Sequence, residues 1–215
     1  MDFFFGRVSG NSARSAFALY ETGAPFTGHP LDTPSGENRT AAYLALNPMG
    51  KVPALIDGDL QLWESNAINW YLAEKYPQAG LLPASLGGRA AVQRWMFFQA
   101  GHLSPASLPI FRATNRRVQR HWQVGGDPSQ LGPAYGELAR YIAVLEAALA
   151  LPGRDWLEGT FSLADIACAP HFWMLAEGEP AFDLGPTPHV KAWLERLWNR
   201  PAWKKAVEAT LSGGG

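Results

Sequence analysis

The stretch NPMGKVPALIDGDLQLWESNAI, residues 47–68, decides the fold of this chain. Within it, residues 52–56 are apolar and partly β-branched, which favours a strand. An Asp-Gly pair follows at 57–58, and this dipeptide is a strong signal for a β-hairpin turn. Residues 60–63 supply the returning strand, and apolar residues at helical spacing predict a helix over 64–76. The stretch therefore predicts a hairpin that leads directly into a helix.

Upstream of this stretch, strands and helices alternate. Residues 2–5 are mostly aromatic and end at a glycine, which indicates a buried strand. Residues 12–21 carry apolar side chains at helical spacing and stop before a glycine, as a helix does. A weaker strand is expected over 26–31 and a short helix over 38–46. The first part of the chain is thus a small α/β domain.

Only helices are expected in the second half. Residues 77–88 are rich in Pro, Gly, Ala and Ser, which indicates a linker. A long helical region over 89–123 should break or bend near Pro105 and Pro109. Further helices are expected over 133–151, 162–176, 189–199 and 201–211. The predicted fold class is α+β, with an α/β domain over 1–77, a linker over 78–87 and an all-helical domain over 88–215.

The composition excludes several classes of protein. The 215 residues are 47% hydrophobic and 17% charged, so the chain can bury a sizeable core and is not disordered throughout. A net charge of −1 gives no basic excess for nucleic acid. The single cysteine, Cys168, excludes a disulfide framework and a multi-cysteine metal site, and its apolar neighbours predict a buried, inert thiol. With no signal peptide and no membrane-length apolar stretch, we expect a cytoplasmic protein with no metal, membrane or nucleic-acid partner.

The Val52-Pro53 pair opens the first strand of the hairpin, where a proline is awkward because it donates no ladder hydrogen bond. Two interpretations are open. A cis bond would turn the backbone amide and carbonyl of Val52 outward, where an extended peptide could pair with them. Alternatively, Pro53 is an ordinary turn proline at the start of an edge strand.

The Glu64-Ser65 pair lies where the second strand passes into a helix. Backbone amides at a helix start are unpaired and favour a carboxylate, to which Ser65 adds a hydroxyl donor. Glu64 can accept from an ammonium group, so the two residues together could hold both charges of an α-amino acid. The alternative is simple capping of the helix by Ser65.

Taken together, the order of the elements, the Val52-Pro53 step and the Glu64-Ser65 pair resemble the cytosolic glutathione transferase family. The segment GTFSLADIA, residues 159–167, matches a second motif of that family, and there Ser162 and Asp165 form a pattern typical of a capping box. The resemblance covers most of the chain. It implies a thioredoxin-like N-terminal domain, an all-helical C-terminal domain, glutathione as co-substrate and a homodimer.

The resemblance also assigns the glutathione-binding residues. It implies that Val52, beside Pro53, binds the cysteinyl backbone of glutathione. Glu64 and Ser65 would bind its γ-glutamyl end. Lys51 would lie near the glycine carboxylate, although an exposed, solvated lysine is an alternative interpretation.

Family members stabilise the glutathione thiolate with a side chain just after the first strand. Most of this thiol is protonated at pH 7, so a hydrogen-bond donor beside the sulfur favours the reactive form. The candidates here are Ser9 first, Asn11 second and Ser12 third. In the alternative interpretation, Ser9 and Asn11 shape a turn and Ser12 caps the helix. Ser15 follows Arg14 where the family has an apolar residue, which leaves the alignment of this loop in doubt.

The second substrate is expected between the two domains, against an aromatic group on the first helix of the helical domain: Trp95, Phe98, His102 and Phe111. Aromatic residues at helical spacing are also typical of a core. The predicted function is a glutathione S-transferase, whose thiolate attacks a hydrophobic electrophile. The alternatives are glutathione-dependent isomerisation, dehalogenation, ether cleavage or reduction, and a non-enzymatic binding module.

Overall fold

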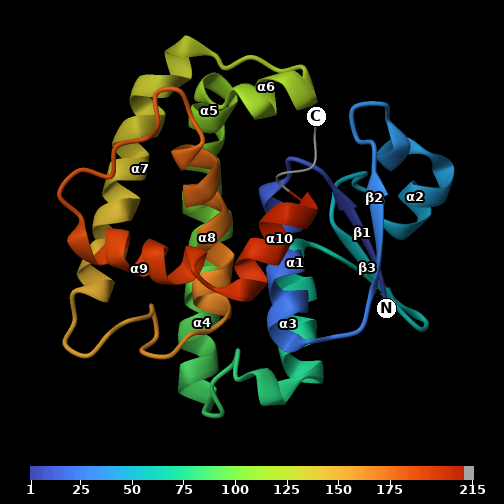
Figure 1. Ribbon diagram of the computed structural model, residues 1–215, viewed down its shortest axis with the longest axis horizontal. Coiled ribbons are helices and arrows are strands. Elements are labelled where there is room, and N and C mark those ends of the chain that lie inside the picture. Colours follow the sequence, from blue (N-terminus) through green and yellow to red (C-terminus); the bar gives the residue numbers. More distant parts are fainter. Residues whose placement is uncertain (211–215) are drawn as a thin grey trace. The chain divides into compact units, whose positions relative to one another are not determined.

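A computed structural model describes residues 1–210 and is shown as a ribbon in Figure 1. The chain divides into two compact units. The first unit contains Met1–Ala79 together with the helix α10, Pro201–Thr210, and the second contains Gly80–Arg200. The predicted helical domain of 88–215 includes α10, whereas the structure groups this helix with the first unit. Leu211, the predicted last residue of this helix, lies outside the described residues.

A four-stranded mixed sheet organises the first unit, in the order β2-β1-β3-β4. The strands are β1 (Asp2–Gly6), β2 (Thr27–Leu31), β3 (Ala54–Asp57) and β4 (Leu60–Trp63). β1 pairs in parallel with β2 and antiparallel with β3, while β3 and β4 form the predicted hairpin. Gly58 in its turn has φ +59°, which a residue without Cβ adopts at no steric cost.

Helices cover both faces of this sheet. α1 (Gly10–Thr22), α3 (Ser65–Lys75) and α10 lie on one face, and α2 (Ala41–Leu46) lies on the other (Figure 1). Side chains alternate across a strand, so Phe3 and Phe5 share one face while Phe4 packs with Tyr43 of α2. α10 belongs to this unit because Trp203 packs its ring 5.3 Å from that of Phe17 on α1. The predicted thioredoxin-like fold class is confirmed.

The second unit is helical in the part of the chain that the structure describes. Its helices are α4 (Leu86–Phe98), α5 (Ser104–Thr114), α6 (Arg116–Trp122), α7 (Pro128–Leu149), α8 (Leu163–Ala176) and α9 (Pro188–Trp198). A single π-helical turn, Gln99–Leu103, joins α4 to α5 just before Pro105, since proline cannot donate the regular helical hydrogen bond. At Pro109 the helix does not break, because α5 continues through that residue.

α8 is the central helix of the second unit. Nearly all of its side chains are buried, including Cys168, as predicted. The predicted capping box is present at its start: the Ser162 amide donates to Asp165, and the Ser162 hydroxyl oxygen accepts from the backbone. Asp165 also accepts from the Trp193 indole at 2.9 Å and from the Leu157 amide at 3.0 Å. One buried carboxyl group therefore holds together α8, α9 and the preceding loop.

Candidate functional site

The three candidate thiolate donors lie where β1 passes into α1: Ser9 precedes the helix, and Asn11 and Ser12 are in its first turn. Ser9 caps α1, and its hydroxyl oxygen accepts from the Ser12 amide at 3.2 Å. The Ser12 side chain is fully buried, and its oxygen accepts from the Gly6 amide at 3.2 Å. Asn11 is exposed. The structure therefore gives the capping role to Ser9 and binds Ser12 to the end of β1.

Arg14 on α1 connects the first turn of that helix to α3. Its side chain is only 1% exposed, an unusual place for a charged group unless it has partners. One guanidinium nitrogen, Nη1, donates to Asn11 Oδ1 at 2.7 Å and to Ser65 Oγ at 2.8 Å. The Ser15 hydroxyl donates to the Ser65 carbonyl at 3.3 Å, which explains why a polar residue follows Arg14. Two of the predicted site residues, Asn11 and Ser65, are thus held by one buried cation.

The start of α3 has an unusual backbone. Glu64 is the N-cap residue, with φ +70° and no capping hydrogen bond from its side chain. A non-glycine residue in the left-handed region costs about 1–3 kcal/mol, and such strain is concentrated at functional sites. Ser65 is the first helical residue, and its oxygen accepts from Arg14 instead of capping the helix. The capping interpretation of Ser65 is therefore excluded.

The Val52–Pro53 peptide bond is cis. The preceding segment is fixed because the Lys51 carbonyl accepts from the Tyr43 hydroxyl and from the Asn47 side chain, both at 2.6 Å. Burial raises the pKa of Tyr43 to about 12, which keeps the phenol protonated as a donor. Among residues 1–210, no hydrogen bond joins the amide or carbonyl of Val52 to another protein group. The Lys51 side chain is exposed.

The sheet gathers these segments at one edge. In the ladder, Phe4 is opposite Ala54, and Ala54 is opposite Trp63. The end of β1, the beginning of β3 and the end of β4 therefore lie together, and the residues that flank them are the candidate residues. A Cβ added to Gly6 would lie 2.8 Å from Val52 Cγ2, which shows how closely the end of β1 approaches the segment before β3.

Two family matches agree with this arrangement. Residues 1–74 match the glutathione S-transferase N-terminal domain, and residues 131–201 match the glutathione S-transferase C-terminal domain. The chain is also 37% identical to glutathione S-transferase 3 of Zea mays over 210 residues, covering 94% of this chain and 90% of the relative. The chain belongs to the glutathione S-transferase family. This confirms the resemblance found in the sequence and the expectation of an enzyme family.

Bacterial members of the family are similar as well. Glutathione S-transferase GstB of Escherichia coli is 35% identical over 184 residues, with 82% of this chain and 83% of the relative covered. The crystal structure of the theta class glutathione S-transferase from Xanthomonas axonopodis pv. citri, with glutathione bound, superimposes with a TM-score of 0.85 at 31% identity. That comparison covers 96% of this chain and 96% of the bacterial one.

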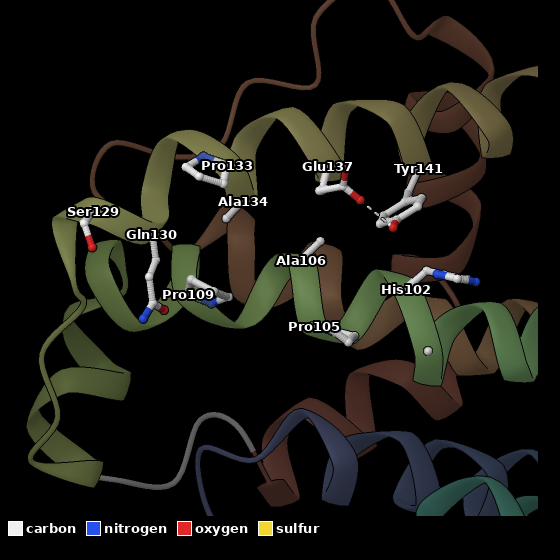
Figure 2. A pocket seen from close by; sticks show the side chains of 11 residues that line it. His102, Pro105, Ala106, Pro109, Ser129, Gln130, Pro133, Ala134, Glu137 and Tyr141 are labelled. Carbon is white, nitrogen blue, oxygen red and sulfur yellow. Dashed lines mark hydrogen bonds between the residues drawn. The ribbon is translucent and has the colours of Figure 1, made fainter.

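The four aromatic candidates lie in different surroundings within the second unit. Trp95 is buried and donates its indole N–H to Glu158 Oε1 at 2.6 Å, so it is part of the core. Phe98 is half-buried and packs edge-on against Trp95 and Tyr141. Phe111 on α5 is half-buried. Of the four, His102 lines a pocket between α5 and α7, shown in Figure 2.

The sequence pattern alone does not assign a role to Arg14, although a charged residue on the otherwise apolar face of a helix is a signal for a buried ion.

The described residues also offer neither a metal site nor a membrane span. Among the described residues, no group of three or more His, Cys, Asp or Glu could hold a metal ion. No helix within residues 1–210 is long and apolar enough to cross a membrane.

Proposed function

We propose that this chain binds glutathione at the edge of the sheet described above and activates its thiol for attack on a hydrophobic electrophile. The observation that carries the proposal is the unpaired backbone of Val52 beside the Glu64–Ser65 start of α3 and the Ser9 loop. Val52 offers one donor and one acceptor to the cysteinyl backbone of glutathione. Pro53 fixes that segment, and Lys51 lies near the glycine carboxylate.

The γ-glutamyl end of glutathione carries an ammonium and a carboxylate. Glu64 accepts from the ammonium, while Ser65 and the first amides of α3 donate to the carboxylate. Arg14 supports this role, because its donation to Ser65 Oγ leaves the hydroxyl hydrogen of Ser65 for the ligand. The positive charge of Arg14 also favours an anion near Ser65.

In the chemical step, the thiol proton leaves to solvent and the Ser9 hydroxyl donates to the thiolate. The sulfur then forms a bond to the electrophilic carbon, and the leaving group departs with its bonding electron pair. The Ser9 hydroxyl has no acceptor among residues 1–210, so it is available to donate. Asn11 is second, because Arg14 occupies its Oδ1 and leaves its Nδ2 as a donor. Ser12 is third, since its side chain is buried.

The test measures the pKa of the thiol of bound glutathione, with the ultraviolet absorbance of the thiolate recorded as pH is raised. In the wild type the pKa should fall below the free value of about 8.5, and in Ser9→Ala it should return toward that value while kcat falls about 10²-fold. Ser85→Ala is the matched control, because Ser85 caps α4 in the same way in the other unit. If the thiol pKa is unchanged in Ser9→Ala, Ser9 is not the donor to the thiolate, and Asn11 is the next residue to replace. Absence of glutathione binding by calorimetry would refute the proposal.

We also propose a cytoplasmic homodimer, since the cytosol keeps glutathione reduced. The Phe97 side chain on α4 is 74% exposed, so a charge placed there tests whether this helix takes part in the interface. Sedimentation analysis should give twice the chain mass for the wild type and the single chain mass for Phe97→Glu. A monomeric wild type would contradict this assembly.

A further inference from the structure

A pocket of about 360 Å³ lies between α5 and α7, within the helical unit (Figure 2). Its walls are apolar because the facing side chains are hydrocarbon only: Pro105, Ala106 and Pro109 on α5, and Pro133 and Ala134 on α7. These side chains are also short or cyclic. Such side chains do not fill the space between two helices. The volume falls within the range of small-molecule sites, which are apolar with a few convergent polar groups.

One end of the pocket carries a carboxylate with an unused oxygen. The Tyr141 hydroxyl and Arg140 Nη2 both donate to Glu137 Oε2, each at 2.6 Å. Glu137 Oε1 has no hydrogen-bond partner among the described residues. The Tyr141 hydrogen bond and the Arg140 charge lower the pKa of Glu137, so this group is ionised at neutral pH.

The cation that balances Glu137 lies outside the pocket lining. The Arg140 guanidinium stacks over the Tyr141 ring, 5.0 Å from its centroid, and does not line the pocket. Inside, the Tyr141 ring lies 5.3 Å from the imidazole of His102, which has no hydrogen bond within residues 1–210. A ligand at this end therefore meets two aromatic rings and an acceptor that carries negative charge.

The opposite end is also next to a carboxylate. Ser129 and Gln130, which line the pocket there, both donate to Asp127 at the start of α7. Neither end of the pocket presents a lysine or arginine in its lining. The charges and the ring surfaces both favour a cation over an anion.

We propose that the α5–α7 pocket binds a flat aromatic molecule that carries a protonated amine. The aromatic body lies between the proline and alanine walls, and the ammonium donates to Glu137 Oε1 beside the rings of Tyr141 and His102. This binding site goes beyond the proposed function, since its ligand is held by the second unit alone and needs no glutathione. An aromatic carboxylate of the same size is disfavoured by Glu137.

Three probes of one shape test the proposal by calorimetry in the absence of glutathione: naphthylmethylamine, naphthylmethanol and naphthoate. The amine should bind most tightly and the carboxylate most weakly. Because the Glu137 side chain is 49% exposed, solvent screens its charge, and Glu137→Gln should weaken the amine about fivefold while the alcohol changes less than about twofold. Glu195→Gln, an exposed carboxylate on α9 of the same unit, is the control for general attraction of cations.

A second variant tests the location. Ala134→Phe places a ring in the pocket and should abolish binding of the amine and the alcohol, with the fold checked by circular dichroism. Equal binding of the three probes, an unchanged amine affinity in Glu137→Gln, or binding that survives in a folded Ala134→Phe would each overturn the proposal. None of these measurements depends on whether the chain binds glutathione.

Discussion

Replacing Arg14 with methionine removes the cation that holds Asn11 and Ser65 while keeping most of the aliphatic volume. The hydrogen bonds to Asn11 and Ser65, at 2.7 and 2.8 Å, are both lost, and the donor is charged in both. Hydrogen bonds to charged groups contribute about 1.5–3 kcal/mol each, and the bond to exposed Asn11 contributes less than the bond to buried Ser65. We therefore expect Arg14→Met to lower the free energy of unfolding by roughly 2–4 kcal/mol, and glutathione to bind at least tenfold more weakly.

A double-mutant cycle isolates the Arg14–Ser65 pair. Arg14→Met, Ser65→Ala and the double variant are unfolded in urea and followed by circular dichroism. If the two groups interact as the 2.8 Å distance indicates, the double variant loses about 1.5–3 kcal/mol less than the sum of the single losses. The cycle with Asn11→Ala serves as the internal comparison and should give a smaller coupling energy. Coupling below about 0.5 kcal/mol for Arg14 and Ser65 would refute the reasoning.

Three further variants test the fold. Burial raises the pKa of Asp165 from 3.8 to about 6, so the wild type loses up to roughly 3 kcal/mol of stability as pH rises through this window, whereas Asp165→Asn does not. The stability advantage of the wild type in urea should thus shrink from pH 4 to pH 7, and an advantage that grows contradicts the raised pKa. Gly6→Ala sets a Cβ 2.8 Å from Val52 and should cost about 1–3 kcal/mol in urea unfolding; no loss would mean that Val52 moves freely. Trp203→Ala empties a fully buried position against Phe17 and should cost about 3–5 kcal/mol, and a change under 1 kcal/mol would argue against this packing.

Local patterns in the sequence were sufficient for most of the fold. The hairpin at 57–58 follows from one dipeptide, and the capping box at Ser162 follows from hydrogen bonds between neighbours in the chain. These features depend on residues a few positions apart, so the sequence carries them directly. The place of α10 depends instead on contact between Phe17 and Trp203, which no local pattern reveals.

In the candidate site, too, local motifs are readable from the sequence and contacts between distant residues are not. The segments around Val52 and Glu64 carry motifs, so the sequence could identify them. The roles of Ser9, Asn11 and Ser12 could not be separated from the sequence, because each can act as the donor until its partners in the fold are known. Ser12 is bound to the end of β1 and Asn11 to Arg14, and both contacts depend on the folded backbone.

Because α10 belongs to the first unit, that unit is built from both ends of the chain. The Val8 amide, one residue before Ser9, donates to the Thr210 carbonyl at 2.7 Å. During synthesis at about 5–20 residues per second, the sheet segments leave the ribosome many seconds before α10 is made. Until then Phe17 lacks its contact with Trp203 and the Val8 amide lacks its acceptor, so the segment before Ser9 gains these contacts only after α10 has emerged.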